Sequence, residues 1–145
     1  METDELRNIL NGLPFMLDMP ESLKQRVAKV FVAISRFDIV EEGTELFREG
    51  DDRIDDGYIV LSGSVKVTKS YAPTSNAFAP VLVGEAKQFN PRSERTATVT
   101  ANEDLDTLHF EWPAFRETVA AEFDATEQEV LRKALLSYAW VHLLN

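Results

Sequence analysis

The residues best suited to chemistry lie in one stretch, residues 83–99, where a glycine, a glutamate and an arginine follow a short β-prone run. Gly84 and Glu85 are adjacent, and Arg95 follows ten residues after the glutamate. Glycine lets the backbone approach a ligand closely, and amides at the start of a helical turn favour an anion. Arginine supplies a permanently charged fork that matches phosphate oxygens. The stretch therefore predicts a site for a small phosphate diester, with Glu85 accepting hydrogen bonds from a sugar hydroxyl.

The same residues also fit a purely structural role, and taken alone they leave this alternative open. Gly84 would then form a turn and Glu85 would be solvated. Arg95 would pair with a neighbouring carboxylate such as Glu94. The choice between the two interpretations depends on the rest of the chain.

Length and composition favour one globular domain that binds neither nucleic acid nor a membrane. With 145 residues, of which 44% are hydrophobic, the chain can bury one substantial core. Its formal net charge is −10, whereas binding to nucleic-acid phosphates needs a basic surface. The acidic start, Met1 to Glu5, does not resemble a secretory signal, and no apolar run reaches the roughly 18–20 residues that span a bilayer. We therefore predict a cytoplasmic location.

The sequence predicts no catalytic or metal centre. The absence of cysteine excludes disulfides, thiolate nucleophiles and thiolate metal ligands. His109 and His142 lie in apolar surroundings without a neighbouring ligand motif, so we expect them to be packing or surface residues. The acidic loop from Asp51 to Asp56 lacks the ligand order of a calcium-binding loop. Because hydrolase, Walker A and zinc-protease motifs are also missing, we predict a protein that is not an enzyme and needs no cofactor.

Periodicity and chain breakers predict helices, then many short strands, then helices again. The helices are expected at residues 3–12, at 21–32, near Trp112-Pro113, and from Asp124 or Thr126 onward. The strands are expected at residues 34–40, 45–48, 57–61, 64–69, 78–83, 95–101 and 105–110. The loop from Ala72 to Asn76 is expected to be the most flexible point. Many short strands at close spacing predict a sandwich or jelly roll.

The final helix has more apolar surface than one core requires. From Ala134 onward its apolar residues cover more than one face, whereas a helix that packs against a single core needs only an apolar stripe. We therefore expect this helix to bury a second surface, against a partner subunit or against a domain outside this chain.

Two groups of residues resemble the cyclic nucleotide-binding domain family, to which the sensor domain of the bacterial catabolite activator protein belongs. The first group is Gly84-Glu85 followed by Arg95-Thr96-Ala97, at the spacing of bacterial members. The second is the pattern of turn glycines within residues 42–51 and 58–67, which looks like the family's first two hairpins. Together they extend the resemblance over roughly residues 10–140.

This resemblance implies a mainly β fold with flanking helices, a double-stranded β-helix or jelly roll. The chain is then a single domain over residues 1–145, with N-terminal helices at 1–33 and C-terminal helices at 112–145. The jelly roll occupies residues 34–111, and the phosphate-binding cassette within it spans residues 83–97.

The resemblance also implies a role for each residue of the cassette. Glu85 would bind the ribose 2′-hydroxyl and Arg95 the cyclic phosphate. The surrounding polar contacts would come from Gly84, Ala86 and Thr96. Lys87 departs from the family pattern, which usually has a small residue there. It could add a cation to the phosphate, or it could mark a pocket altered for another ligand.

The expected ligand is cAMP, with cGMP as the second candidate because Thr96 offers a hydroxyl that favours guanine in some family members. Lys87 and Gln88 leave open a different class of function, an adaptor of the same fold that binds no cyclic mononucleotide or is tuned to a cyclic dinucleotide. No DNA-binding helix pair is recognisable after residue 124. We therefore expect the output to pass through the C-terminal helix to a protein partner or a second copy of the chain.

Overall fold

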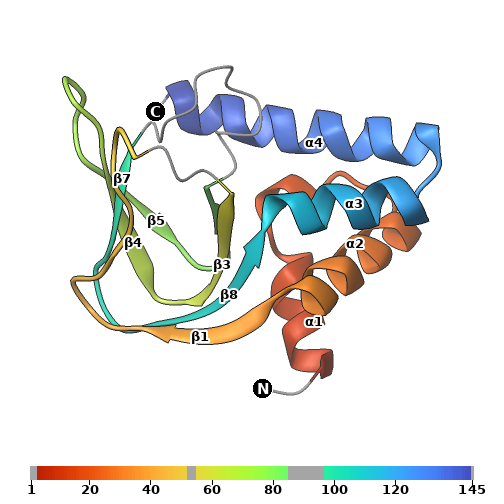
Figure 1. Cartoon of the computed structure of the whole chain (residues 1–145), viewed down its shortest axis with the longest axis horizontal. Coiled ribbons are helices and arrows are strands. Elements are labelled where there is room, and N and C mark those ends of the chain that lie inside the picture. Colours follow the sequence, from red (N-terminus) through yellow and green to blue (C-terminus); the bar gives the residue numbers. More distant parts are fainter. Residues whose placement is uncertain (1–2, 52–54, 85–96, 145) are drawn as a thin grey trace.

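The computed structural model describes residues 3–51, 55–84 and 97–144. Within these residues, eight strands form two four-stranded antiparallel sheets, as expected for a jelly roll (Figure 1). The first sheet contains, in spatial order, β1 (Arg36–Val40), β8 (Leu105–Glu111), β3 (Asp56–Ser62) and β6 (Val81–Val83). The second sheet contains, in spatial order, β2 (Glu45–Phe47), β7 (Thr98–Ala101), β4 (Ser64–Thr68) and β5 (Ser75–Phe78). The predicted mainly β fold is confirmed.

The described residues contain four α-helices and one short 3₁₀ helix. They are α1 (Thr3–Asn11), η1 (Pro14–Met16), α2 (Glu21–Ile34), α3 (Trp112–Glu122) and α4 (Ala125–Leu144). α1, α2 and α3 lie beside the sheets, and α4 runs along the top of the view (Figure 1). β8 leads directly into α3, where Pro113 occupies the first turn as expected. This continuity joins the sheets to the C-terminal helices without an intervening loop.

Aromatic side chains join the helices to the first sheet. Phe31 of α2 lies edge-on to Phe110 of β8, with ring centroids 5.2 Å apart, and stacks on Phe115 of α3 at 4.9 Å. The Trp112 ring lies 5.3 Å from the ring of Phe115 and 5.0 Å from the ring of Phe110, between centroids. None of the four side chains is more than 4% exposed, and each buried ring contributes about 1.5–3 kcal/mol to folding. This cluster fixes α2 and α3 on the sheet.

The predicted turn glycines are confirmed, since Gly43, Gly50 and Gly63 have φ values of 86°, 86° and 99°. Two predictions in the next part of the chain are wrong. Ser75 and Asn76, expected within a flexible loop, form the start of β5 and pair with Val67 and Lys66 of β4.

The predicted strand over residues 78–83 is also interrupted. Phe78 ends β5, a turn at Ala79-Pro80 follows, and β6 begins only at Val81. Proline has no backbone N–H to donate to a strand ladder. The polar residues of β5 form a strand because β4 supplies their backbone partners, which local propensity does not reveal.

Smaller differences occur at element ends. α2 extends to Ile34, where the first strand was expected to start, and β1 begins at Arg36. The start of α4 confirms Asp124 rather than Thr126 as the cap. The Asp124 carboxylate accepts the N–H of Glu127 at 2.8 Å, and the Glu127 carboxylate accepts the N–H of Asp124 at 3.0 Å. This reciprocal arrangement is a capping box.

Candidate functional site

Gly84 is the one residue of the predicted site that the structure describes, and its backbone can only be formed by glycine without strain. It follows the end of β6 and has φ +96°. A Cβ atom at this position would lie 2.8 Å from the Phe47 ring of β2 and 2.9 Å from the backbone oxygen of Asp56 in β3. Gly84 therefore lets the end of the first sheet pack directly against a side chain of the second.

Glu85, Ala86, Lys87, Arg95 and Thr96 lie outside the described residues. Their predicted roles consequently stay predictions. What the structure describes is how the segment containing them is anchored: β6 in the first sheet precedes it and β7 in the second sheet follows it. The candidate site therefore belongs to a connection between the two sheets.

The anchor after this segment is Thr98, the first residue of β7. Its hydroxyl oxygen accepts the backbone N–H of Glu49 at 2.9 Å. The Glu49 carboxylate in turn accepts the backbone N–H of Ser70 at 2.9 Å and its hydroxyl at 2.6 Å. These two hydrogen bonds lower the pKa of Glu49, although the group is fully exposed. The loops after β2 and β4 are thereby tied to the start of β7.

Aromatic side chains pack beside the end of β6 and Gly84, which precede the undescribed segment. Tyr58 of β3 lies directly across the ladder from Val83 and meets the Phe47 ring edge-on, with centroids 5.6 Å apart. On its other side Tyr58 stacks on His109 at 4.4 Å, and the His109 Nε2 atom lies 3.0 Å from the Asp56 carboxylate. His109 is thus a packing residue, as predicted.

Sequence reasoning did not single out Phe47 and Tyr58 as neighbours of Gly84. Both occur in strand patterns, which signal that an aromatic residue packs in a sheet but not which loop it supports. The contact joins residues from three strands, and no local spacing indicates it.

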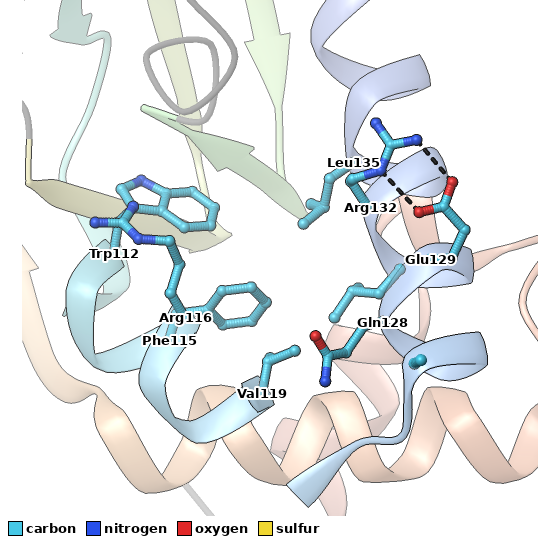
Figure 2. A pocket seen from close by; sticks show the side chains of 10 residues that line it. Trp112, Phe115, Arg116, Val119, Gln128, Glu129, Arg132 and Leu135 are labelled. Carbon is cyan, nitrogen blue, oxygen red and sulfur yellow. Dashed lines mark hydrogen bonds and ion pairs between the residues drawn. The ribbon is translucent and has the colours of Figure 1, made fainter. Parts of the chain in front are cut away.

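A cavity of about 650 Å³ separates α3 from α4. Figure 2 shows Trp112, Phe115 and Val119 of α3 on one side, facing Gln128 and Leu135 of α4 on the other. A second cavity of about 580 Å³ lies on another side of α4, next to η1 and the β5–β6 turn. Within the described part of α4, only the side chains of Leu131 and Leu135 are buried hydrophobic residues. Val130 and Ala134 are partly buried against the same core, so up to residue 137 α4 packs on the domain through one stripe of side chains.

Within residues 3–51, 55–84 and 97–144, no three His, Cys, Asp or Glu side chains gather in a way that could hold a metal ion. None of the helices in the same ranges is both long and apolar enough to cross a membrane.

The two-sheet topology, the helices beside it and the glycine-led connection between the sheets define a jelly-roll ligand-binding domain. The chain belongs to the cyclic nucleotide-binding domain family, whose sequence profile matches residues 38–122, more than half of its length. The matched range includes every residue of the candidate site.

The chain is also similar to a curated protein of greater length. The chain is 31% identical over 96 residues to the Pycsar effector protein RsmPycTIR of Rhodovulum sp. (strain MB263), and this match covers 64% of the chain. The chain spans only 37% of that relative's length.

Two solved structures share the fold. The sensor domain of the transcriptional regulator DNR from Pseudomonas aeruginosa superposes with a TM-score of 0.68 at 18% identity, covering 94% of this chain and 92% of the other. The regulatory domain of Toxoplasma gondii PKA, solved with cAMP, superposes with a TM-score of 0.60 at 23% identity. That match covers 79% of this chain and 43% of the other.

Proposed function

We propose that this domain is a non-catalytic sensor that binds a cyclic mononucleotide, cAMP in the first place, and passes the binding signal through α4 to a partner. In this proposal Arg95 holds the cyclic phosphate and Glu85 the ribose 2′-hydroxyl. The remaining polar contacts come from Gly84, Ala86, Lys87 and Thr96.

The geometry of Gly84 is the observation that carries the proposal. Its positive φ and its close approach to Phe47 and Asp56 give β6 an exit that only glycine can form, immediately before the predicted binding residues. Backbone conformations of this kind are found where a loop must hold a defined shape around a ligand. The family profile extends across the same segment, which favours binding over the alternative of a solvated turn.

The choice of cAMP rests on two supports. The spacing from Glu85 to Arg95 follows that of bacterial family members, and the Toxoplasma gondii regulatory domain, which has the same fold, was solved with cAMP. cGMP is the second candidate because of the hydroxyl of Thr96. Lys87 favours a further candidate, a pocket tuned to a cyclic dinucleotide or an adaptor without a nucleotide.

The output is proposed to reach a protein partner or a second copy of the chain through α4. The relative from Rhodovulum is described as an effector and is longer than this chain, which fits a sensor domain that controls another component. A net charge of −10 disfavours nucleic acid as the partner. A cytoplasmic location stays a prediction from the N-terminal sequence.

Titration calorimetry and thermal melts with cAMP, cGMP, cyclic di-GMP and AMP test the proposal. A ligand at a hundredfold excess over its Kd adds about 2.7 kcal/mol to stability, which raises the Tm of a domain of this size by several degrees. We expect such a rise with cAMP and none with AMP. A rise with cyclic di-GMP alone would favour the re-tuned pocket, and no rise with any ligand would favour the adaptor.

Arg95→Ala tests the assigned phosphate contact, and Arg92→Ala is the matched control because it removes the same charge from the same segment. Arg95→Ala should weaken cAMP binding at least about tenfold, or about 1.4 kcal/mol, while Arg92→Ala should bind nearly as the wild type does. Equal affinities in the two variants would refute the role of Arg95.

A further inference from the structure

Arg26 of α2 makes three contacts with the junction between α3 and α4. Its Nη2 donates a hydrogen bond to the backbone oxygen of Glu122, the last residue of α3, at 2.7 Å. Its Nη1 forms an ion pair with the carboxylate of Glu127 in the first turn of α4. The guanidinium also lies 4.5 Å from the centroid of the Phe123 ring. One side chain thus holds the end of one helix, the connecting residue and the start of the next.

Hydrogen bonds within the α3–α4 junction add to the contacts of Arg26. Phe123 is 5% exposed, and its N–H donates to the backbone oxygen of Val119 at 3.0 Å. Its own backbone oxygen accepts a hydrogen bond from Gln128 Nε2 at 2.8 Å. Glu127 belongs to the capping box as well as to the ion pair, so its two carboxylate oxygens serve different partners. The first turn of α4 is therefore fixed in place.

Beyond this turn and up to residue 137, α4 packs on the domain mainly through its buried residues Leu131 and Leu135. The ion pair of Glu127 with Arg26 links the first turn of α4 to α2, whereas Arg132 pairs with Glu129 inside α4 itself. The cavities of about 650 and 580 Å³ adjoin the same helix. Both are grooves open to solvent, so the α4 side chains that line them are only partly covered by the rest of the domain.

The opposite wall of the larger cavity carries a related defect. Among the residues that the structure describes, the buried indole N–H of Trp112 has no hydrogen-bond partner, an arrangement that costs about 1–3 kcal/mol. The α3–α4 arrangement therefore combines a partly exposed polar contact at Arg26 with open grooves beside α4, and contacts of this kind can break and re-form when an element changes its direction.

We propose that Arg26 is a positioning residue that latches α4 in its resting direction, and that α4 turns about Phe123 and Asp124 when this latch is released. The proposal rests on the proposed function in one respect, that α4 carries the output of ligand binding. It makes the response of α4 depend on a residue in the N-terminal helices, remote in sequence from the predicted cassette. A ligand can move α4 only by preferring one direction over the other, and the latch sets the energy difference between them.

Distance measurements between two spin labels test the latch without any ligand. The chain has no cysteine, so Glu117→Cys on α3 and Lys133→Cys on α4, both exposed positions, give one labelled pair across the junction. The wild-type background should give a single narrow distance distribution. Arg26→Gln should broaden it and add a second population at another distance.

Two further variants make the test specific. Glu127→Gln removes the charge that pairs with Arg26 but keeps an amide oxygen that can accept the capping hydrogen bond, so it should broaden the distribution as Arg26→Gln does. Arg132→Gln is the matched control, because it breaks an arginine–carboxylate pair contained within α4. It should leave the distribution narrow. Tm values measured on all variants ensure that folded proteins are compared.

The outcomes separate the latch from the proposed function. Distributions that are equally narrow in the Arg26→Gln, Glu127→Gln and Arg132→Gln backgrounds would overturn the latch. If Arg26→Gln is broad but saturating cAMP leaves the wild-type distribution unchanged, the latch stands and relay of cAMP binding through α4 fails. If cAMP shifts the wild-type distribution toward the second population of Arg26→Gln, both proposals are supported.

Discussion

Replacing Gly84 by alanine should destabilise the domain more than the same change at Gly43, a glycine with positive φ and no neighbour near its Cβ position. Two separate costs add at Gly84. An alanine at φ +96° is strained by about 1–2 kcal/mol. Its Cβ would also lie 2.9 Å from the Asp56 backbone oxygen and 2.8 Å from the Phe47 ring, an overpacking that costs about 1–3 kcal/mol.

Gly43→Ala is the control that isolates the crowding. Gly43 has a similar φ of 86°, but a Cβ there would have no neighbour within 4 Å. We therefore expect about 1–2 kcal/mol of destabilisation for Gly43→Ala and about 2–5 kcal/mol for Gly84→Ala. Urea unfolding followed by tryptophan fluorescence measures both values.

The comparison refutes the packing argument if the two variants lose the same stability. Equal losses would mean that Phe47 and the β3 backbone move aside without cost, and that Gly84 is required only for its backbone conformation. A larger loss for Gly84→Ala, with an unchanged dependence on urea concentration, would support the packing argument.

Two further predictions concern hydrogen bonds accepted by one carboxylate each, that of Asp124 and that of Glu49. Asp124→Ala should lower the free energy of unfolding by about 1 kcal/mol because α4 loses its N-terminal cap. Thr126→Ala, two residues on, should lower it by less. Equal losses in the two variants would contradict the assignment of Asp124 as the cap. The pKa of Glu49 should lie below its ordinary value because Ser70 donates two hydrogen bonds to the carboxylate. Glu49 therefore stabilises the folded state at pH values above its ordinary pKa. This stabilisation is lost as the pH falls through the lowered pKa of the folded state. Carboxyl NMR titration should show the Glu49 pKa rising in Ser70→Ala, and an unchanged pKa would contradict the assignment.

The sequence predicts most of the fold because its strands are bounded by residues with strong local preferences. Gly43, Gly50 and Gly63 mark three of the turns, and their positive φ values agree with the glycine requirement that suggested them. β5 was missed for the opposite reason. Its residues Ser75 and Asn76 have no strand preference of their own, and the pairing with β4 that makes them a strand is a tertiary contact.

The site shows the same division between local and long-range information. Gly84 was predicted from its place in a motif, as a residue that lets backbone approach a ligand. The structure adds a second reason for glycine, the contact with Phe47 and the β3 backbone, which is not visible in the motif. Arg26 was not predicted at all, because its partners Glu122 and Glu127 lie about a hundred positions away in the sequence.

Gly84 and the latch at Arg26 are joined by a continuous path of backbone and core contacts. Gly84 packs on the backbone of Asp56, and the backbone oxygen of the preceding Asp55 accepts the N–H of Trp112, the first residue of α3, at 2.7 Å. α3 then runs to the junction that Arg26 holds. Proximity along a path is not coupling in itself.

The types of contact nevertheless differ between the two ends of this path. The contacts from Gly84 to α3 are backbone hydrogen bonds and tightly packed atoms, which resist small displacements. Those at Arg26 are a half-exposed ion pair, one side-chain hydrogen bond and a ring contact, which can break and re-form. We therefore propose the switch at Arg26 rather than nearer the predicted nucleotide site, because the contacts at Arg26 are the ones on this path that can most readily break and re-form.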